Sequence, residues 1–478
     1  MDLVKGYVFS ILYGIVCIAL GLVAYKLGMQ KKYSRKVVHI LVGFEWLILY
    51  HYMGAGLHFL IVCLAFTSLL AVTYFKKLMP MISSDSDNAP GTVYYGVAMS
   101  IMAIICLFVP KMIIPFGIGV FATSVGDGFA GVFGQLIKKY NPKIYGNKTL
   151  FGSLFNLLFS AIGALIFSAA FDLGLKIWQC ALIGLFAAGI ELIVGYGLDN
   201  VLITVGVSLF SYALIYYPII NIFILPIVLT PFVIAVVVEK KVLTLYGLIL
   251  AILLDFIVSF VFGNFGFILL LSFLFLSVVA DKFKKHAKKS ETGDKVDSSR
   301  SAIQVLANGL APAFMALAYA LTLKDFFIAA YVAALAEALS DTFASGFGAF
   351  SNKTFDLFKL KKIEKGLSGG MSLIGTLSSI LGAFIISFIA YLFGAVDLKL
   401  FLMCALAGII GAFFDSFLGS VFQIKYKCKK CAEIIEKPVH CGKMADRYSG
   451  FEFFDNDVVN LFSSFFAAAL AACLSYIV

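Results

Sequence analysis

The stretch SVGDGFAGVFGQLIKKYNPKIYGNKTLFGS, residues 124–153, joins an apolar segment to a basic loop. The apolar part carries Asp127, the loop holds four lysines, and Thr149 and Gly152 stand where the next apolar run begins. An ionised aspartate inside a membrane span costs on the order of 3 kcal/mol unless it is paired or faces water. The position of Asp127 therefore predicts a functional site at a membrane boundary.

The whole chain has the composition of a membrane protein. Its 478 residues are 62% hydrophobic, and the mean hydropathy is +1.00. A spanning helix needs about 20 apolar residues, and the alternating strands of a membrane β-barrel are absent. We expect an all-α polytopic membrane protein whose first apolar run is a span, not a cleaved signal peptide. About sixteen spans are predicted, at 7–28, 37–52, 56–75, 92–110, 112–134, 151–171, 177–195, 201–217, 220–238, 243–262, 264–281, 303–323, 326–347, 370–395, 399–421 and 457–477.

The basic residues segregate between alternate loops. If residue 1 lies outside and every span crosses, the loops predicted inside hold 32 of the 37 lysines and arginines. Positive charge favours the cytosolic side. The net charge of +10 is therefore assigned to a cytosolic face, and nucleic-acid binding is not needed to explain it.

The opening motif occurs twice. SVGDGFAGVFG at 124–134 aligns with ALSDTFASGFG at 338–348, an offset of 214 residues and eight predicted spans. An even number of spans preserves direction, so the sequence predicts two parallel-related eight-helix modules. The matched pairs are Asp127 with Asp341, Phe129 with Phe343, Ala130 with Ala344, Phe133 with Phe347, and Gly134 with Gly348.

Further acidic residues recur at equivalent predicted helices. Glu191 and Asp415 lie near the inner ends of the seventh and fifteenth spans, DNV at 199–201 opens the eighth, and DNDVVN at 455–460 opens the sixteenth. Polar bonding between helices is the alternative for each residue alone, but convergence on one face favours a site. Carboxylates suit Mg²⁺, for which Asp127 and Asp341 are the candidate ligands. The candidate catalytic residues are Asp127, Glu191, Asp199, Asp341 and Asp415.

Several polar residues near these carboxylates are candidates for binding nucleotide or substrate. Backbone N–H groups at a helix start, together with lysines, suit phosphate, although neither glycine-containing loop is a P-loop. Arg35 and His39 share one helical face, where a positive-inside anchor is the alternative for Arg35. The candidates in the first module are Arg35, His39, Thr92, Tyr95, Lys148, Thr149, Gly152, Ser153 and Asn200. Those in the second are Arg300, Gln304 and Asn308 as a predicted i, i+4, i+8 stripe, then Gly369, Gly370, Ser372, Gly375, Thr376, Asn456, Asp457 and Asn460.

Three of the nine cysteines share one loop predicted inside. The pattern Cys428-x2-Cys431-x8-His440-Cys441 fits a small structural zinc knuckle, and unligated cytosolic thiols are the alternative. The other six cysteines sit in apolar spans, where a thiol behaves as a small hydrophobe. No disulfide framework is expected.

The first half of the chain resembles the polyprenol kinase family, which includes phytol kinase and dolichol kinase and uses CTP. The matching elements are RKVVH, GTVYY, GDGFAGVFG, KTLFGS, and Glu191 followed by DN, within about residues 30 to 215. The second half resembles the phytyl-phosphate kinase family of membrane proteins over about 225 to 478. Its matches are RSAIQVLANG, SDTFAS, GGMSLIGT, FDSFLG, the Cys/His loop and DNDVVN. One departure is Gly346, where that second family usually has a glutamate.

The resemblance implies two domains, 1–218 and 219–478, with the Cys/His loop at 422–456 in the second. It implies a CTP- and Mg²⁺-dependent kinase that converts an isoprenoid alcohol such as phytol, geranylgeraniol or farnesol to the monophosphate and then the diphosphate, as in isoprenoid salvage. Asp127, Glu191 and Asp199 would hold metal or activate the hydroxyl, and Lys148 and Arg35 would bind phosphates.

Two other classes of function remain open from the sequence. A CTP-dependent diacylglycerol kinase or a phosphatidate cytidylyltransferase would suit the motifs of the first half nearly as well. A membrane transporter with parallel repeats is the non-enzyme alternative, but its polar site would lie at the midplane. Only Glu45 and Asp255 are predicted that deep.

Overall fold

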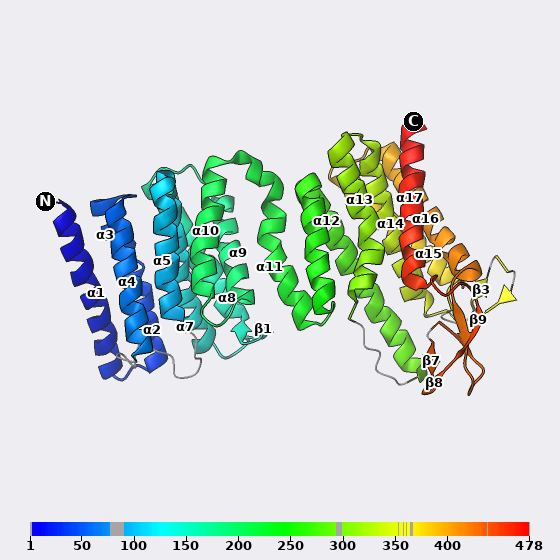
Figure 1. The fold of residues 1–478 in the computed structure, drawn as a ribbon, viewed down its shortest axis with the longest axis horizontal. Helices are drawn as coiled ribbons and strands as arrows, with labels where there is room; N and C mark the ends of the chain where they lie inside the picture. Colours follow the sequence, from blue (N-terminus) through cyan, green and yellow to red (C-terminus); the bar gives the residue numbers. More distant parts are fainter. Residues whose placement is uncertain are drawn as a thin grey trace. The chain divides into compact units, whose positions relative to one another are not determined.

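The chain is an α-helical polytopic membrane protein, as predicted (Figure 1). The computed structural model describes residues 2–76, 90–292, 299–351, 353–356, 358–359, 361–363, 367–436 and 438–477. Within these ranges, thirteen helices are long and apolar enough to cross a membrane. The chain divides into two compact units, Met1–Glu239 (the first unit) and Lys240–Val478 (the second unit).

The first unit is a helical bundle with one small hairpin. Its helices are α1 (Asp2–Lys26), α2 (Lys31–Val42), α3 (Glu45–Met53), α4 (Leu57–Phe75), α5 (Gly91–Phe108), α6 (Ile113–Phe121), α7 (Gly128–Leu136), α8 (Leu150–Ala170), α9 (Ile177–Ile193), α10 (Asp199–Tyr216) and α11 (Ile224–Glu239). A π-helical turn, η2 (Ala122–Asp127), joins α6 to α7, and the antiparallel strands β1 (Lys143–Tyr145) and β2 (Lys148–Thr149) precede α8.

The second unit combines helices with short antiparallel strands. Its helices are α12 (Leu245–Thr292), α13 (Ala302–Thr322), α14 (Phe326–Gly348), α15 (Leu373–Leu392), α16 (Leu398–Val421) and α17 (Asn456–Ile477). A hairpin of β3 (Phe355–Asp356) and β4 (Lys361–Lys362) precedes α15. Between α16 and α17 lie a three-stranded sheet in the order β6 (Ile434–Ile435), β5 (Lys425–Lys427), β9 (Asp446–Ser449), and a hairpin of β7 (Val439–His440) and β8 (Lys443–Met444).

Three segments account for the difference between the thirteen candidate spans and the sixteen predicted. The predicted span 37–52 is broken into α2 and α3, which both pack against α1. The predicted spans 243–262 and 264–281 both lie within α12, where two helices meet at a kink at Gly263, a residue with φ of +59°, so the two count as one candidate. Helix α9 is apolar and has 17 residues, which is the lower end of the spanning range. The predicted domain boundary at 218 also differs from the structural division, because α11 packs against α9 inside the first unit.

The aspartate motif of each unit lies on a helix that its neighbours surround. In the first unit, η2 and the helices on either side of it contact α2, α8 and α10, and every residue of Ala122–Asp127 is buried. A side chain at Gly119 would meet the backbone oxygen of Thr204, so α10 can approach only because this residue is glycine. In the second unit, α14 packs in the same way among α13, α15, α16 and α17.

The two units share a local arrangement around the matched motifs. The hydroxyl of Thr149 caps α8 by accepting from the Gly152 N–H at 3.3 Å, and a side chain on Gly152 would approach Gly134 and the Ala130 oxygen. The corresponding residues of α14 and α15 repeat these contacts, with a cap distance of 3.1 Å: Ser372, Gly375, Gly348 and Ala344. The repeat seen in the sequence is therefore also a repeat of helix packing.

Candidate active site

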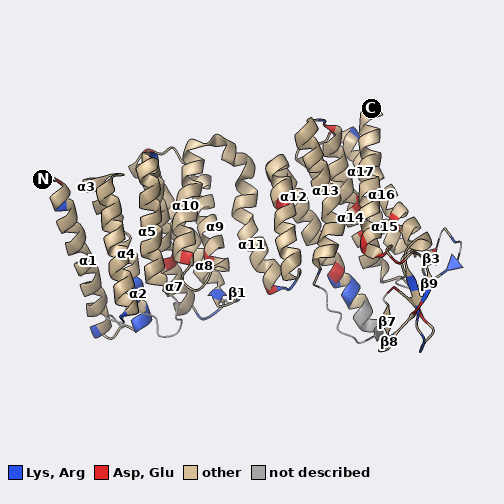
Figure 2. Ribbon diagram, viewed as in Figure 1, with Lys and Arg blue, Asp and Glu red and all other residues tan. Residues whose placement is uncertain are grey.

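The first unit contains a cavity of about 1280 Å³ that is charged at one end and mainly apolar elsewhere. Its charged end brings together residues from α2, η2, β2, α9 and α10. In the first unit, lysines and arginines gather near the end of α1, the start of α2 and β1, and acidic residues lie beside α7 and α10 (Figure 2). Of the predicted site residues, the cavity wall includes Arg35, His39, Thr92, Tyr95, Asp127, Lys148, Thr149, Gly152, Glu191, Asp199 and Asn200.

Asp127, the last residue of the π-helical turn, is held by two groups on α2. The Lys36 ammonium donates to Asp127 Oδ2 at 2.7 Å. His39 Nε2 donates to the backbone oxygen of Thr123 at 3.0 Å and lies 3.7 Å from the same carboxylate oxygen. π-Helical turns are frequent at functional sites. Here the turn ends with a buried carboxylate at the cavity wall.

Lys148 links the other two carboxylates of the first unit. Its ammonium donates to Glu191 Oε1 at 2.5 Å and lies 3.5 Å from Asp199 Oδ2. Burial alone would lower the pKa of Lys148, but the carboxylates of Glu191, Asp127 and Asp199 together raise it above its usual range. Lys148 therefore stays an ammonium over the physiological range. The second oxygen of Glu191 is buried without a hydrogen-bond partner among the described residues.

The remaining predicted residues of the first unit have mixed roles. The Tyr95 hydroxyl is buried without a partner among the described residues, and its ring lies edge-on to His39, with centroids 5.7 Å apart. Asn200 donates from its amide to the Gly91 oxygen at 2.8 Å, which ties α10 to the start of α5 beside Thr92. Ser153 is buried one turn into α8 and is not part of the cavity wall.

Sequence reasoning missed Lys36. The prediction named Arg35, which does line the cavity, but the ion pair with Asp127 belongs to the next residue. Residues three apart on a helix are neighbours, and so are residues four apart. By spacing alone, Lys36 and Arg35 are therefore equally able to share a helix face with His39. The three-residue spacing of Lys36 and His39 is visible in the sequence, but it does not show which of Arg35 and Lys36 lies beside Asp127.

The second unit gathers its carboxylates differently. Asp415 accepts from Ser463 Oγ at 3.2 Å and, with the amide nitrogen of Asn460 turned toward it, from Asn460 at 3.2 Å. Glu337 lies one turn before Asp341 on α14, is 1% exposed, and accepts from Ser464 at 2.5 Å. Its other oxygen has no partner among the described residues, and no lysine or arginine of the described chain forms an ion pair with any of the three carboxylates. Glu337 was missed because it lies within an alanine-rich run before the matched motif.

Other predicted residues of the second unit make local contacts. Arg300 precedes α13, so it is not on the predicted helical stripe, and it donates to Asp281 at 2.7 Å and to Ser277. Gln304 completes a capping box with Ser301, and Asn308 donates to the Gln304 oxygen. These contacts anchor the start of α13. Within the described part of the chain, they do not connect Arg300, Gln304 and Asn308 to the carboxylates of α14 and α16.

The glycine loop before α15 is fastened to neighbouring elements. Gly369 has φ of +85° and touches Ser420, and Gly370 packs on Ile363, leaving no room for a side chain at either position. The N–H of Ser368 donates to Glu436 at 2.5 Å, and Lys425 donates to the Ser368 oxygen at 2.8 Å. Ser372 and Gly375 form the α15 cap beside Thr376. At the start of α17, the N–H of Asp457 donates to Asp455, next to Asn456.

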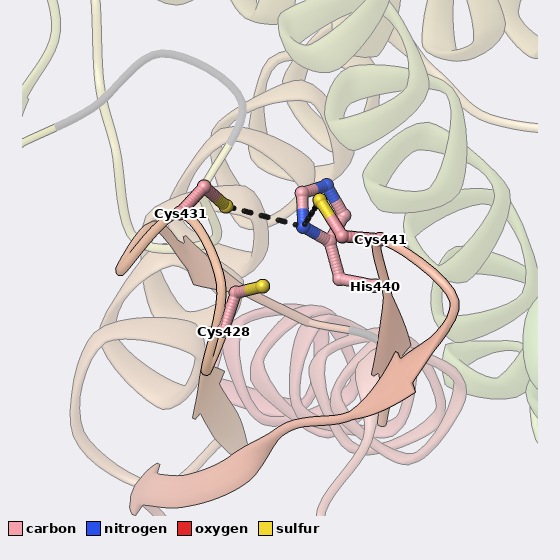
Figure 3. A group of neighbouring side chains, drawn as sticks. All are labelled: Cys428, Cys431, His440 and Cys441. Atoms are coloured by element: carbon pink, nitrogen blue, oxygen red, sulfur yellow. Dashed lines mark hydrogen bonds between the residues drawn. The ribbon is translucent and has the colours of Figure 1, made fainter.

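The four predicted zinc ligands converge. Cys428, Cys431, His440 and Cys441 place one ligand atom each within 4.8 Å of one another (Figure 3). The sulfurs of Cys431 and Cys441 both lie 3.4 Å from His440 Nδ1. Ligands of tetrahedral zinc lie about 3.3 to 3.8 Å apart, so the two sulfur–nitrogen distances match a zinc site. Hydrogen bonds from the Cys431 backbone, the His440 side chain and the Lys430 backbone lower the pKa of Cys428 to about 6, toward the thiolate that binds metal.

Comparison with known proteins places the chain in a family. The integral membrane protein family DUF92 matches residues 228–468, slightly more than half of the chain. The chain belongs to the DUF92 family. An uncharacterized membrane protein of Methanocaldococcus jannaschii is 36% identical over 181 residues, which cover 37% of this chain and 74% of that protein.

Two further relatives are more distant. The chloroplastic protein VTE6 of Arabidopsis thaliana is 25% identical over 222 residues, which cover 45% of this chain and 60% of that protein. A phytol kinase of Synechocystis is 24% identical over 184 residues, which cover 38% of this chain and 78% of that protein. No solved structure matches the chain.

Proposed function

We propose that the first unit is a kinase that phosphorylates an isoprenoid alcohol of the phytol type, with CTP as donor, and that the second unit phosphorylates the product to the diphosphate. The observation that carries this proposal is the cavity that joins Asp127, Glu191, Asp199, Lys36 and Lys148 to a long apolar wall. A lipid with a terminal hydroxyl matches that combination. The similarity to a phytol kinase supports the same substrate class.

The side chains of the first unit can divide the work of phosphoryl transfer. Catalysis of this reaction rests on positioning and on stabilising charge. Lys148, a permanent ammonium, would hold nucleotide phosphates, and Asp127 would orient the lipid hydroxyl and accept its proton. Lys36 and His39 fix the Asp127 carboxylate for that role. The apolar wall would exclude water, which otherwise competes as acceptor.

The donor set of the first unit fits Mg²⁺. Asp127, Asp199 and Glu191 offer carboxylate oxygens, and the second Glu191 oxygen is buried with no hydrogen bond among the described residues to satisfy it. Mg²⁺ prefers one or two carboxylates together with substrate phosphates. When bound, the ion would neutralise phosphate charge during transfer.

The second unit would act on the monophosphate with Glu337, Asp341 and Asp415. Gly346, where the resembling family usually has a glutamate, packs against α12, and a Cβ there would lie 2.9 Å from Ala280 Cβ. A glutamate at that position would not fit without moving α12. We infer that Glu337 supplies the third carboxylate from the same helix. The Cys/His loop is proposed to bind structural zinc, because its four ligands leave no open position.

Labelled CTP tests this function against its alternatives. Purified protein in detergent is given Mg²⁺ with CTP labelled on the γ- or the α-phosphate, and a panel of phytol, geranylgeraniol, farnesol, diacylglycerol and phosphatidate. We expect γ-label in the isoprenoid products. γ-Label in phosphatidate would indicate a diacylglycerol kinase, and α-label in lipid a cytidylyltransferase. If no lipid is labelled, a membrane transporter would be the remaining alternative.

A further inference from the structure

Two helices build the long apolar wall of the cavity. Each presents one face to it, with residues three or four positions apart, which is the spacing of one side of a helix. On α1 the wall residues are Tyr7, Ser10, Ile11, Gly14, Ile15 and Ile18. On α4 they are Ile61, Val62, Ala65, Phe66, Leu69 and Leu70.

These two helices line the same space without packing together. Helix α1 packs on α2 and α3, whereas α4 packs on α5 and α3, and α1 and α4 share no extended contact in the described part of the chain. Large apolar side chains of the wall are left open: Ile11 is 64% exposed, Ile15 58% and Leu69 55%. Between helices of membrane-spanning length, such side chains face lipid tails.

We propose that the gap between α1 and α4 is a lateral opening through which the lipid alcohol enters from the bilayer, and that its hydrocarbon chain lies along the gap with the hydroxyl toward Asp127. This inference rests on the proposed function for the identity of the lipid. On α4 the wall runs from Tyr74, near the charged end, to Ile61, over thirteen residues or about 20 Å of helix. The gap is therefore long enough to hold an extended chain of many carbons.

A buried carboxylate also lies in the cavity wall, beside α1. Glu45, the first residue of α3, is hydrogen-bonded to Ser10 of α1, and both line the cavity. Burying this pair against a hydrocarbon chain would leave its polar atoms no added partner, which is unfavourable. The hydrocarbon chain is therefore expected to avoid the Glu45–Ser10 pair.

A large side chain at Gly14 should obstruct the gap. A Cβ at Gly14 would meet nothing within 4 Å, so we expect the ring of Gly14→Phe to enter the opening. Ala65→Phe narrows the gap from α4. The matched control is Leu12→Phe, because Leu12 lies on another face of α1, is 52% exposed and is not part of the cavity wall.

The first readout is binding, which does not depend on turnover. Geranylgeraniol carrying a diazirine near its end is photolysed with the full-length protein, and labelled peptides are mapped. We expect label on α1 and α4 that unlabelled geranylgeraniol displaces. Gly14→Phe or Ala65→Phe should reduce this labelling at least about tenfold, because two or three methylenes of the lipid would no longer be buried. Displaceable label on other helices, or label that neither substitution changes, would overturn the proposal.

The second readout separates this inference from the proposed function. In a kinase assay, both obstructing variants should raise KM for the 20-carbon alcohol at least about tenfold, and should change KM for a five-carbon prenyl alcohol less than about twofold, since the short chain occupies only the charged end. Leu12→Phe should change neither. An equal effect on both alcohols would contradict the gap. A wild-type protein that labels on α1 and α4 yet phosphorylates no alcohol would disprove the kinase and leave the gap standing.

Discussion

Asp127 and its partners show how far a residue can be assigned from sequence. An aspartate in an apolar segment, repeated at Asp341, was sufficient to locate both candidate sites. The sequence did not identify the partner of Asp127, because Arg35 and Lys36 are adjacent and both precede His39 by about one helical turn. Only the packing of α2 against α7 determines that Lys36 makes the ion pair.

Lys36→Met should therefore impair alcohol phosphorylation more than Arg35→Met. Removing Lys36 leaves the buried Asp127 carboxylate without its cation, and we expect kcat/KM to fall by about a hundredfold or more. The measurement is γ-label transfer to geranylgeraniol. Loss of a buried partner also destabilises folding by about 3 to 5 kcal/mol, so thermal unfolding in detergent accompanies each assay. An equal or larger loss in a folded Arg35→Met protein would contradict the assignment.

Glu337→Gln tests the carboxylate that sequence reasoning missed. Glu337 and Asp341 lie one helical turn apart on α14, and with Asp415 they offer the carboxylate oxygens that Mg²⁺ prefers. We expect the Mg²⁺ concentration for half-maximal conversion of monophosphate to diphosphate to rise about tenfold, with the first step unchanged. The matched control is Ser464→Ala, which removes the hydrogen bond to Glu337 but keeps its charge. An unchanged Mg²⁺ dependence in Glu337→Gln would refute this role.

At the scale of elements, hydropathy found the helices and the break at Gly263, but it missed two other interruptions. The predicted spans 37–52 and 112–134 contain a break between α2 and α3 and the π-helical turn before α7. Both interruptions depend on close approach: a side chain at Gly43 would collide with Ser124, and one at Gly126 with Ser160. A run of apolar residues does not encode which neighbour comes that near, so tertiary packing decides these features.

The Cys/His loop gives an element-scale prediction. Its strand β5 and the residues after β6 fasten the glycine loop before α15 through Lys425 and Glu436. Purified protein should hold about one zinc ion per chain, and Cys431→Ser should lose it. Because the glycine loop is then less firmly held, formation of diphosphate should fall at least about tenfold while monophosphate formation persists.

Cys473→Ser is the control for that experiment, because Cys473 is an exposed cysteine of α17 outside the ligand set. It should keep both its zinc and its activity. Metal analysis that finds wild-type zinc in Cys431→Ser would rule out the predicted ligand set. Equal loss of both steps would show that the loop does not serve the second unit alone.

At the scale of the whole molecule, the sequence predicted two related halves and placed their motifs on equivalent helices. The structure repeats the helix packing around the motifs, including the caps at Thr149 and Ser372. The division between the halves was not predictable from the motifs. It depends on the side to which α11 packs, and that helix is apolar over almost its whole length.

The orientation of the molecule remains a prediction and has a direct test. In sealed vesicles of defined orientation, CTP should support lipid phosphorylation only when it is added to the face that carries the basic loops, because positively charged loops stay in the cytosol. Permeabilised vesicles give the total activity. Equal activity from either face before permeabilisation would refute the predicted topology.

The central claim is that each unit carries out one of two consecutive phosphorylations. The measurement is product analysis by mass spectrometry, with geranylgeraniol or its monophosphate as substrate and CTP as donor, in wild type, Asp127→Asn and Asp341→Asn. Asp127→Asn should lose at least about nine-tenths of the alcohol kinase rate and still convert added monophosphate to diphosphate. Asp341→Asn should accumulate monophosphate and form no diphosphate. If either substitution abolishes both steps, if their effects are exchanged, or if the wild type forms no diphosphate, the claim is contradicted.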